Sequence, residues 1–83
     1  MEEMIFTPEE LIKMGFIFNY RFPFEEGGHY EVYEFKKNES EIEVTYEYNQ
    51  NGTFNNGCIE FNGSVLKGRA ITAKDVELLK ELM

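Results

Sequence analysis

The stretch SEIEVTYEY, residues 40–48, most constrains the fold because polar and apolar side chains alternate along it. Successive side chains of a β-strand point to opposite faces of the sheet. The side chains expected to face the core are Ile42, Val44, Tyr46 and Tyr48, and those expected on the other face are Glu41, Glu43, Thr45 and Glu47. The pattern therefore predicts a half-buried strand that carries a row of carboxylates on its second face.

Both ends of the chain show the pattern of a helix start. In FTPEELIKMG, Thr7 is a cap, Glu10 completes a capping box and Gly15 marks the stop. In ITAKDVELLKELM, Thr72 is the cap and Asp75 follows three residues later. The second helix is expected to bury Val76, Leu79, Leu82 and Met83 and to turn Glu77, Lys80 and Glu81 to water. Helices this short need a surface on which to dock.

That surface is predicted to be a sheet, with further strands at residues 16–22, at residues 29–37, and from Thr53 to Phe61. In the first of these, the side chains interpreted as one core-facing row are Phe16, Phe18, Tyr20 and Phe22. The strand at residues 29–37 has apolar residues on both faces, which is typical of a central strand or of an exposed aromatic pair. Asn56–Gly57 predicts a bulge, and Asn62–Gly63 is expected to end the last strand.

Short links between the strands favour an antiparallel meander. We expect an α+β fold in which a four-stranded antiparallel meander carries short N- and C-terminal helices on one face, in the order α-β-β-β-β-α. The 83 residues are expected to form a single domain, 1–83.

Charge limits the possible partners, because 16 acidic residues against eight basic ones give a formal net charge of −8. The chain has no Lys or Arg between Asn38 and Leu66, which argues against direct binding to nucleic acid. A charged partner is expected to be a protein with a basic surface. The single Cys58, the acidic start MEEMIF and the lack of a long apolar run predict a cytoplasmic protein that does not bind a membrane.

No arrangement of residues predicts catalysis. His29 is the only histidine; beside Glu25 or Glu26 it would be a general base, but a loop histidine is more often solvated. Cys58 is interpreted as a small hydrophobic strand residue. Neither metal-ligand spacing nor a phosphate-binding loop is present. We therefore expect a protein that is not an enzyme and that has no catalytic residues, metal site or cofactor.

Binding is the remaining class of function. Glu60 on a neighbouring strand, and either Glu31 or Glu34 on another, would extend the row of carboxylates sideways. Such a row resembles one strand of nucleic acid in charge density. The alternative is a polar face that is only solvated. Phe24 follows Pro23 in a glycine-containing loop and is expected to be an exposed contact.

TPEELIKMGF near the start and LKGRAITAKDVELLKEL at the end resemble segments of short, uncharacterised acidic proteins of bacteriophages and mobile elements of Bacteroidota. The likeness covers about a third of the chain and carries no functional residues. It implies a setting in the host cytoplasm. Small acidic phage proteins include anti-CRISPR and other anti-defence inhibitors, several of which mimic nucleic acid, and also capsid accessories.

Two functions are thus expected. The first is a binding protein, such as a phage-encoded inhibitor, that occupies a basic nucleic-acid-binding surface of a host defence protein. Its expected partner-binding residues are Glu41, Glu43, Glu47, Glu60, Glu31 and Phe24. The alternative is a structural or assembly accessory that acts through aromatic contacts and the edge strand at residues 16–22, with self-association as one outcome.

Overall fold

The computed structural model describes residues 6–66 and 71–83. Most of MEEMIF, and residues 67–70 of LKGRAITAKDVELLKEL, lie outside these ranges. The helices are α1 (Pro8–Lys13) and α2 (Ala73–Glu81), and the strands are β1 (Ile17–Pro23), β2 (His29–Lys37), β3 (Ser40–Tyr48), β4 (Phe54–Phe61) and β5 (Ser64–Val65). The predicted α+β fold, with a helix at each end of an antiparallel sheet, is confirmed.

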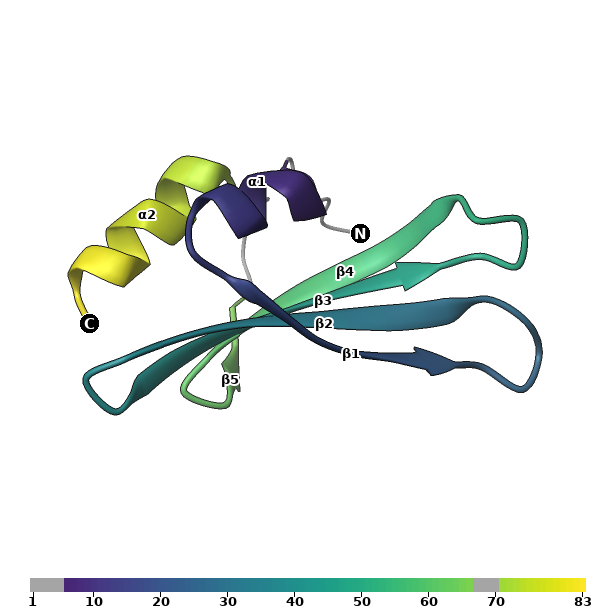
Figure 1. Ribbon diagram of the computed structural model, residues 1–83, viewed down its shortest axis with the longest axis horizontal. Coiled ribbons are helices and arrows are strands. Elements are labelled where there is room, and N and C mark those ends of the chain that lie inside the picture. Colours follow the sequence, from purple (N-terminus) through teal and green to yellow (C-terminus); the bar gives the residue numbers. More distant parts are fainter. Residues whose placement is uncertain (1–5, 67–70) are drawn as a thin grey trace.

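The strands form one antiparallel sheet in the order β1-β2-β3-β4-β5, so each strand pairs with its neighbour in sequence (Figure 1). The predicted meander is therefore confirmed, while the two-residue β5 is an addition. Asn62 and Gly63 both have positive φ, 50° and 86°, which is typical of the tightest hairpin turns. Asn62–Gly63 ends β4 at Phe61, as predicted, and also turns the chain back into the short strand β5.

Both helices lie on the same face of the sheet (Figure 1), and the core fills the space between the two layers. Leu11 of α1 and Val76 of α2 are fully buried there. The alternation predicted for residues 40–48 is confirmed, because Ile42, Val44 and Tyr46 are buried in this core. Hydrophobic burial on one face of the sheet thus holds two helices that are too short to be stable alone.

The predicted capping boxes are present at both helix starts. The Thr7 hydroxyl accepts from the Glu10 backbone N–H, and the Thr7 backbone N–H donates to the Glu10 carboxylate. Thr72 and Asp75 make the same reciprocal pair at α2. These bonds satisfy backbone donors that the first helical turn leaves free, and they fix where each helix begins.

Two side chains near the C-terminal end of α2, Lys80 and the C-cap Leu82, lie differently from the prediction. Leu82 is 79% exposed, because it is the C-cap and extends past the edge of the core. Lys80 does not face water: its ammonium group donates to the Met14 carbonyl at the end of α1 and lies 4.8 Å from the centre of the Phe35 ring. Lys80 therefore links the two helices to the sheet.

The prediction for β1 was wrong in one respect, since its aromatic residues do not share a face. Phe18 pairs with Tyr33 and Tyr20 pairs with Val32, so the register shifts and Asn19 is the extra residue. Such a bulge reverses the side-chain alternation. Phe16 is buried as expected, but Phe18, Tyr20 and Phe22 are 43–53% exposed.

A second bulge lies in β4, close to the predicted position. Glu47 pairs with Asn56 and Tyr48 pairs with Phe54, so the extra residue is Asn55 rather than Asn56 or Gly57. The strand begins at Phe54, one residue later than predicted.

Candidate interaction surface

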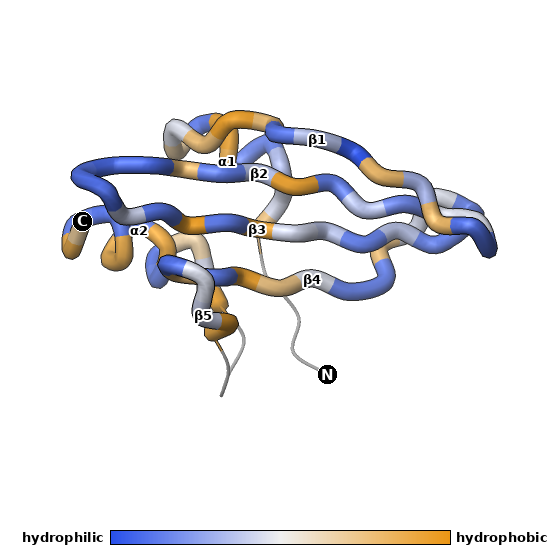
Figure 2. Tube along the Cα trace, turned by 90° about the horizontal axis from the view of Figure 1, so that it is seen from below, coloured by the Kyte–Doolittle hydropathy of each residue, from blue (hydrophilic) through white to orange (hydrophobic). Residues whose placement is uncertain are grey.

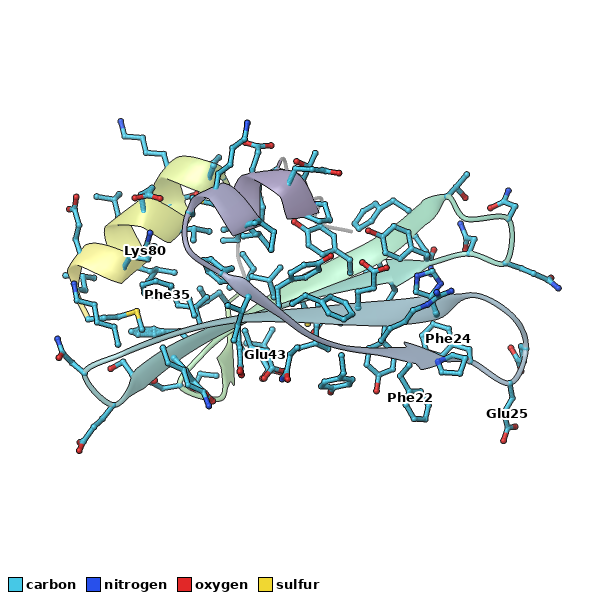
Figure 3. The ribbon with its side chains drawn as sticks, viewed as in Figure 1. Phe22, Phe24, Glu25, Phe35, Glu43 and Lys80 are labelled. Carbon is cyan, nitrogen blue, oxygen red and sulfur yellow. The ribbon has the colours of Figure 1, made fainter. Side chains whose placement is uncertain are left out.

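The face of the sheet opposite the two helices is the candidate site, and Figure 2 looks onto this side of the molecule. The strand register defines this open face as Ile17, Tyr20, Phe22, Tyr30, Val32, Glu34, Lys36, Glu41, Glu43, Thr45, Glu47, Asn56, Cys58, Glu60 and Val65. In Figure 3, Glu43 and Phe22 point away from the side that holds Phe35 and Lys80. Neither described helix packs on the open face (Figure 1).

Three carboxylates form a line across the strands at the middle of the open face. Glu34 of β2 pairs with Glu43 of β3, and Glu43 pairs with Glu60 of β4. Residues directly opposite each other on antiparallel strands have Cβ atoms about 4.5–5.5 Å apart. We call Glu34, Glu43 and Glu60 the acidic row. Partial burial raises the pKa of Glu43, and the charges of Glu60, Glu41 and Glu34 raise it further.

The structure places most of the predicted contact residues together. Glu41, Glu43 and Glu47 lie on the open face along β3, and Glu60 lies beside them on β4. Glu31 is the exception, because it pairs with Tyr46 and so lies on the helix-covered face. Glu34, the other candidate on β2, extends the row of carboxylates in place of Glu31. The reason is that Tyr33 and Phe35 pack on the core and thereby turn the odd-numbered residues of β2 toward the helices.

The acidic row is only weakly neutralised by its described neighbours. Lys36 Nζ lies 4.0 Å from Glu34 Oε2, at the limit of an ion pair, and its side chain is 65% exposed. Asn19 Nδ2 donates to the same oxygen over 3.5 Å. Because the Lys36 side chain is largely solvated, such a pair contributes about 0–1 kcal/mol. The described residues of the open face therefore carry a net negative charge along β3 and β4.

An aromatic patch adjoins the acidic row on the side of β1. Tyr30 is its centre, with the rings of Phe22 and Phe24 each 5.5 Å from it and that of Tyr20 6.0 Å from it. Phe24 is 36% exposed, as the loop position predicted. Sequence reasoning assigned Tyr20 and Phe22 to the core, because nothing in FIFNYRF signals the bulge at Asn19. Val32, which pairs with Tyr20, is buried although it lies on the open face.

His29 begins β2 and belongs to a polar network on the helix-covered side, not to a solvated loop. Arg21 Nη2 lies 3.4 Å from His29 Nδ1, and because a guanidinium only donates, Nδ1 is the acceptor. His29 Nε2 then donates to Glu31 Oε2 over 3.2 Å, and the Tyr33 hydroxyl donates to Glu31 Oε1 over 2.9 Å. Glu31, rather than Glu25 or Glu26, is the carboxylate at this histidine. The network orients these side chains against the sheet.

Cys58 lies on the open face opposite Thr45 and is half-buried. Burial is the main cause that raises the pKa of its thiol; nearby carboxylates add to this effect, and a hydrogen bond with Thr45 opposes it. A thiol with a raised pKa stays protonated and is a poor nucleophile at neutral pH. This environment is that of a packing residue.

Within residues 6–66 and 71–83, no three His, Cys, Asp or Glu side chains are grouped so that they would hold a metal ion. None of the helices in these ranges has the length and apolar character needed to cross a membrane. Comparison with protein-family models, with curated proteins and with solved structures finds no match to this chain.

Proposed function

We propose that the chain is a non-enzymatic binding protein whose open face docks on a basic protein surface. The observation that carries this proposal is the acidic row, which crosses three adjacent strands on a face that neither described helix covers. The aromatic patch beside it supplies the large, semi-rigid side chains that are enriched at binding hot spots.

The cost of the acidic row to folding supports a role in binding. Like charges placed directly opposite each other on neighbouring strands destabilise a sheet, by an amount comparable to the roughly 0.2–1 kcal/mol of favourable cross-strand pairs. A face that is only solvated needs polar residues, and Thr, Ser or Gln would serve without that repulsion. Three facing glutamates therefore oppose folding and favour a cationic partner.

The spacing of these charges supports a sharper form of the proposal. Carboxylates along β3 recur every ~6.6–6.8 Å, and those of the acidic row repeat across strands about 4.8 Å apart. A Lys- and Arg-lined groove built for a phosphate backbone would accept such an array. The proposed activity is inhibition of a host defence protein, such as a nuclease, by occupation of its nucleic-acid-binding surface.

The test compares two variants that each remove two charges. Glu43→Gln with Glu60→Gln changes the acidic row, while Glu77→Gln with Glu81→Gln changes exposed residues of α2. Each protein is immobilised and exposed to lysate of the native host, and the captured proteins are then eluted with duplex DNA or with rising NaCl. We expect a protein that the wild type and the α2 variant retain, that the row variant loses, and that DNA displaces.

Three other outcomes would each contradict a different part of the proposal. Equal capture by all three proteins would remove the acidic row as the binding face. Capture that depends on the row but resists DNA would retain a basic partner and remove mimicry of nucleic acid. Binding that ignores salt would contradict a charge-led interface, whose association rate falls as salt screens the charges.

A second candidate function, assembly through the sheet edge, is supported by β1 itself. This strand is an edge of the sheet, and all seven of its residues are exposed. An exposed edge presents backbone N–H and C=O groups for pairing with another strand. Light scattering of the purified protein tests this candidate: growth of mass with concentration supports assembly, and a monomer at all concentrations argues against it.

A further inference from the structure

A small hollow opens on the helix-covered side, between the start of α1 and the paired ends of β3 and β4. It measures about 160 Å³ and is lined by Phe6, Thr7, Pro8, Tyr46, Tyr48 and Phe54. An apolar cavity of about 150 Å³ accommodates benzene. The hollow therefore has room for one compact group of that size, and not for a drug-sized ligand.

The aromatic rings around the hollow stand at steep angles to one another. Tyr46 is edge-on to Phe6, with centroids 6.4 Å apart, and to Phe54, with centroids 6.0 Å apart. Tyr48 is edge-on to Phe54 at 6.3 Å. The lining rings thus meet edge to face and do not stack on one another, while His29 stacks on Tyr48 with centroids 4.9 Å apart. The negative face of an aromatic ring attracts a cation placed within about 6 Å of its centre.

The electrostatic surroundings also favour a cation. Glu9 and Glu10 lie in the first turn of α1, next to the lining residues Thr7 and Pro8, and offset the positive end of that helix. Burial is the main cause that raises the pKa of Tyr46; the neighbouring Tyr48 and Tyr33 come next, and the charges of Glu10 and Glu9 add to the effect. For Tyr48, burial again dominates and Glu31 and Glu9 contribute. Carboxylates of α1 and β2 thus add to the raised pKa of both lining tyrosines, although Glu31 is already bonded to His29 and Tyr33.

The hydrogen bonding of the lining residues selects the kind of cation. The Tyr46 hydroxyl already donates to the Phe6 carbonyl, and the Thr7 hydroxyl is engaged in the capping box with Glu10. A primary ammonium brings three N–H donors, and burying them without acceptors is costly. A quaternary ammonium has no N–H group to satisfy and disperses its charge over methyl groups.

We propose that this hollow is a binding site for a quaternary ammonium group, held by the rings of Tyr46, Tyr48 and Phe54 beside the acidic first turn of α1. The site is separate from the open face, so the proposal does not depend on the function proposed above. The group has two possible sources, a small molecule such as choline or a trimethyl-lysine side chain of a protein.

The experiment follows the NMR signals of the tyrosine and phenylalanine rings in the full-length protein. Tetramethylammonium and choline are titrated beside 3,3-dimethyl-1-butanol, the uncharged isostere of choline. We expect both cations to shift the ring signals of Tyr46, Tyr48 and Phe54, with an affinity about two- to thirtyfold above that of the isostere. Equal affinity for the isostere, or no shift of these rings, would overturn the proposal.

Substitutions locate the site and identify its source. Phe54 is 42% exposed, so Phe54→Leu should leave the protein folded while it lowers the affinity for choline by about two- to thirtyfold. Phe22→Leu, which changes an exposed ring on the open face, is the matched control and should bind as the wild type does. A trimethyl-lysine peptide that binds more tightly than choline assigns the site to a protein ligand, and the reverse order assigns it to a small molecule. Unchanged binding by Phe54→Leu would contradict the assigned site.

Discussion

Glu43 is the residue at which the charge of the open face acts most directly on folding. It lies in the middle of the acidic row, between Glu34 and Glu60, and Glu41 is next but one along the same strand. Partial burial and these three neighbours raise the pKa of its carboxyl group in the folded chain. Between the unfolded and the folded pKa, the folded protein binds more protons, so stability falls as pH rises through that window.

Glu43→Gln should therefore stabilise the protein at pH 7, by roughly 0.2–1 kcal/mol, because it removes the repulsion and the cost of burying a charge. The gain over the wild type should shrink as pH falls through the raised pKa of Glu43, and it should be nearly lost below the ordinary glutamate pKa of about 4.3, where the protonated side chain resembles glutamine. Urea unfolding followed by tyrosine fluorescence at pH 7 and at pH 4 measures both values. Glu81→Gln on α2 is the control, and a gain from Glu43→Gln that did not change with pH would contradict the prediction.

At the scale of single elements, sequence reasoning succeeded where the signals are local. The capping boxes at Thr7 and Thr72 need only residues three positions apart, and the alternation along β3 is complete within nine residues. These signals located both helices and the central strand. The face of β3 that carries Glu41, Glu43 and Glu47 followed from the same alternation.

The predictions were wrong where contacts between residues far apart in the sequence determine the structure. The bulge at Asn19 depends on how β1 pairs with β2, and it moved Tyr20 and Phe22 from the expected core to the open face. The choice between Glu31 and Glu34 depended on which face of β2 packs against the helices, since both faces carry apolar residues. Neither could be read from a single segment, and so part of the aromatic patch was missed and Glu31, not Glu34, was chosen as a contact residue.

The contact made by Lys80 is another long-range feature and gives an element-scale prediction. Its ammonium group bonds the Met14 carbonyl at the end of α1 and lies over the Phe35 ring. Lys80→Met keeps the apolar stem but removes the charge. We expect a loss of about 1–3 kcal/mol in the free energy of unfolding, because a charge-assisted hydrogen bond and a cation–π contact disappear together. Urea unfolding measures the loss.

Lys74→Met on the same helix is the matched control, since Lys74 is exposed. It should change the free energy of unfolding by less than about 0.5 kcal/mol. Equal effects of the two substitutions would show that Lys80 acts only through the overall charge of the chain.

In the molecule as a whole, the two faces of the sheet differ in what covers them. On one face of the sheet, two helices bury the core and leave the aromatic hollow at the end of β3. On the other face, charge is concentrated and neither described helix covers it. The net charge of −8 makes carboxylates on both faces repel one another, and the ionic strength sets the distance over which this repulsion acts.

Salt should therefore affect folding and binding in opposite directions. The screening length is about 30 Å at 0.01 M salt and about 8 Å at 0.15 M, and the molecule measures 38 × 24 × 23 Å. At low salt, carboxylates across the whole protein repel one another, whereas at 0.15 M mainly near neighbours such as the acidic row do so. We expect the urea midpoint of the wild type to rise with NaCl over this range, and to rise less for Glu43→Gln with Glu60→Gln. The same NaCl series should weaken capture of the basic partner, so loss of binding at high salt could not be explained by unfolding. A midpoint that fell or stayed constant with NaCl would show that repulsion among these carboxylates does not limit the fold.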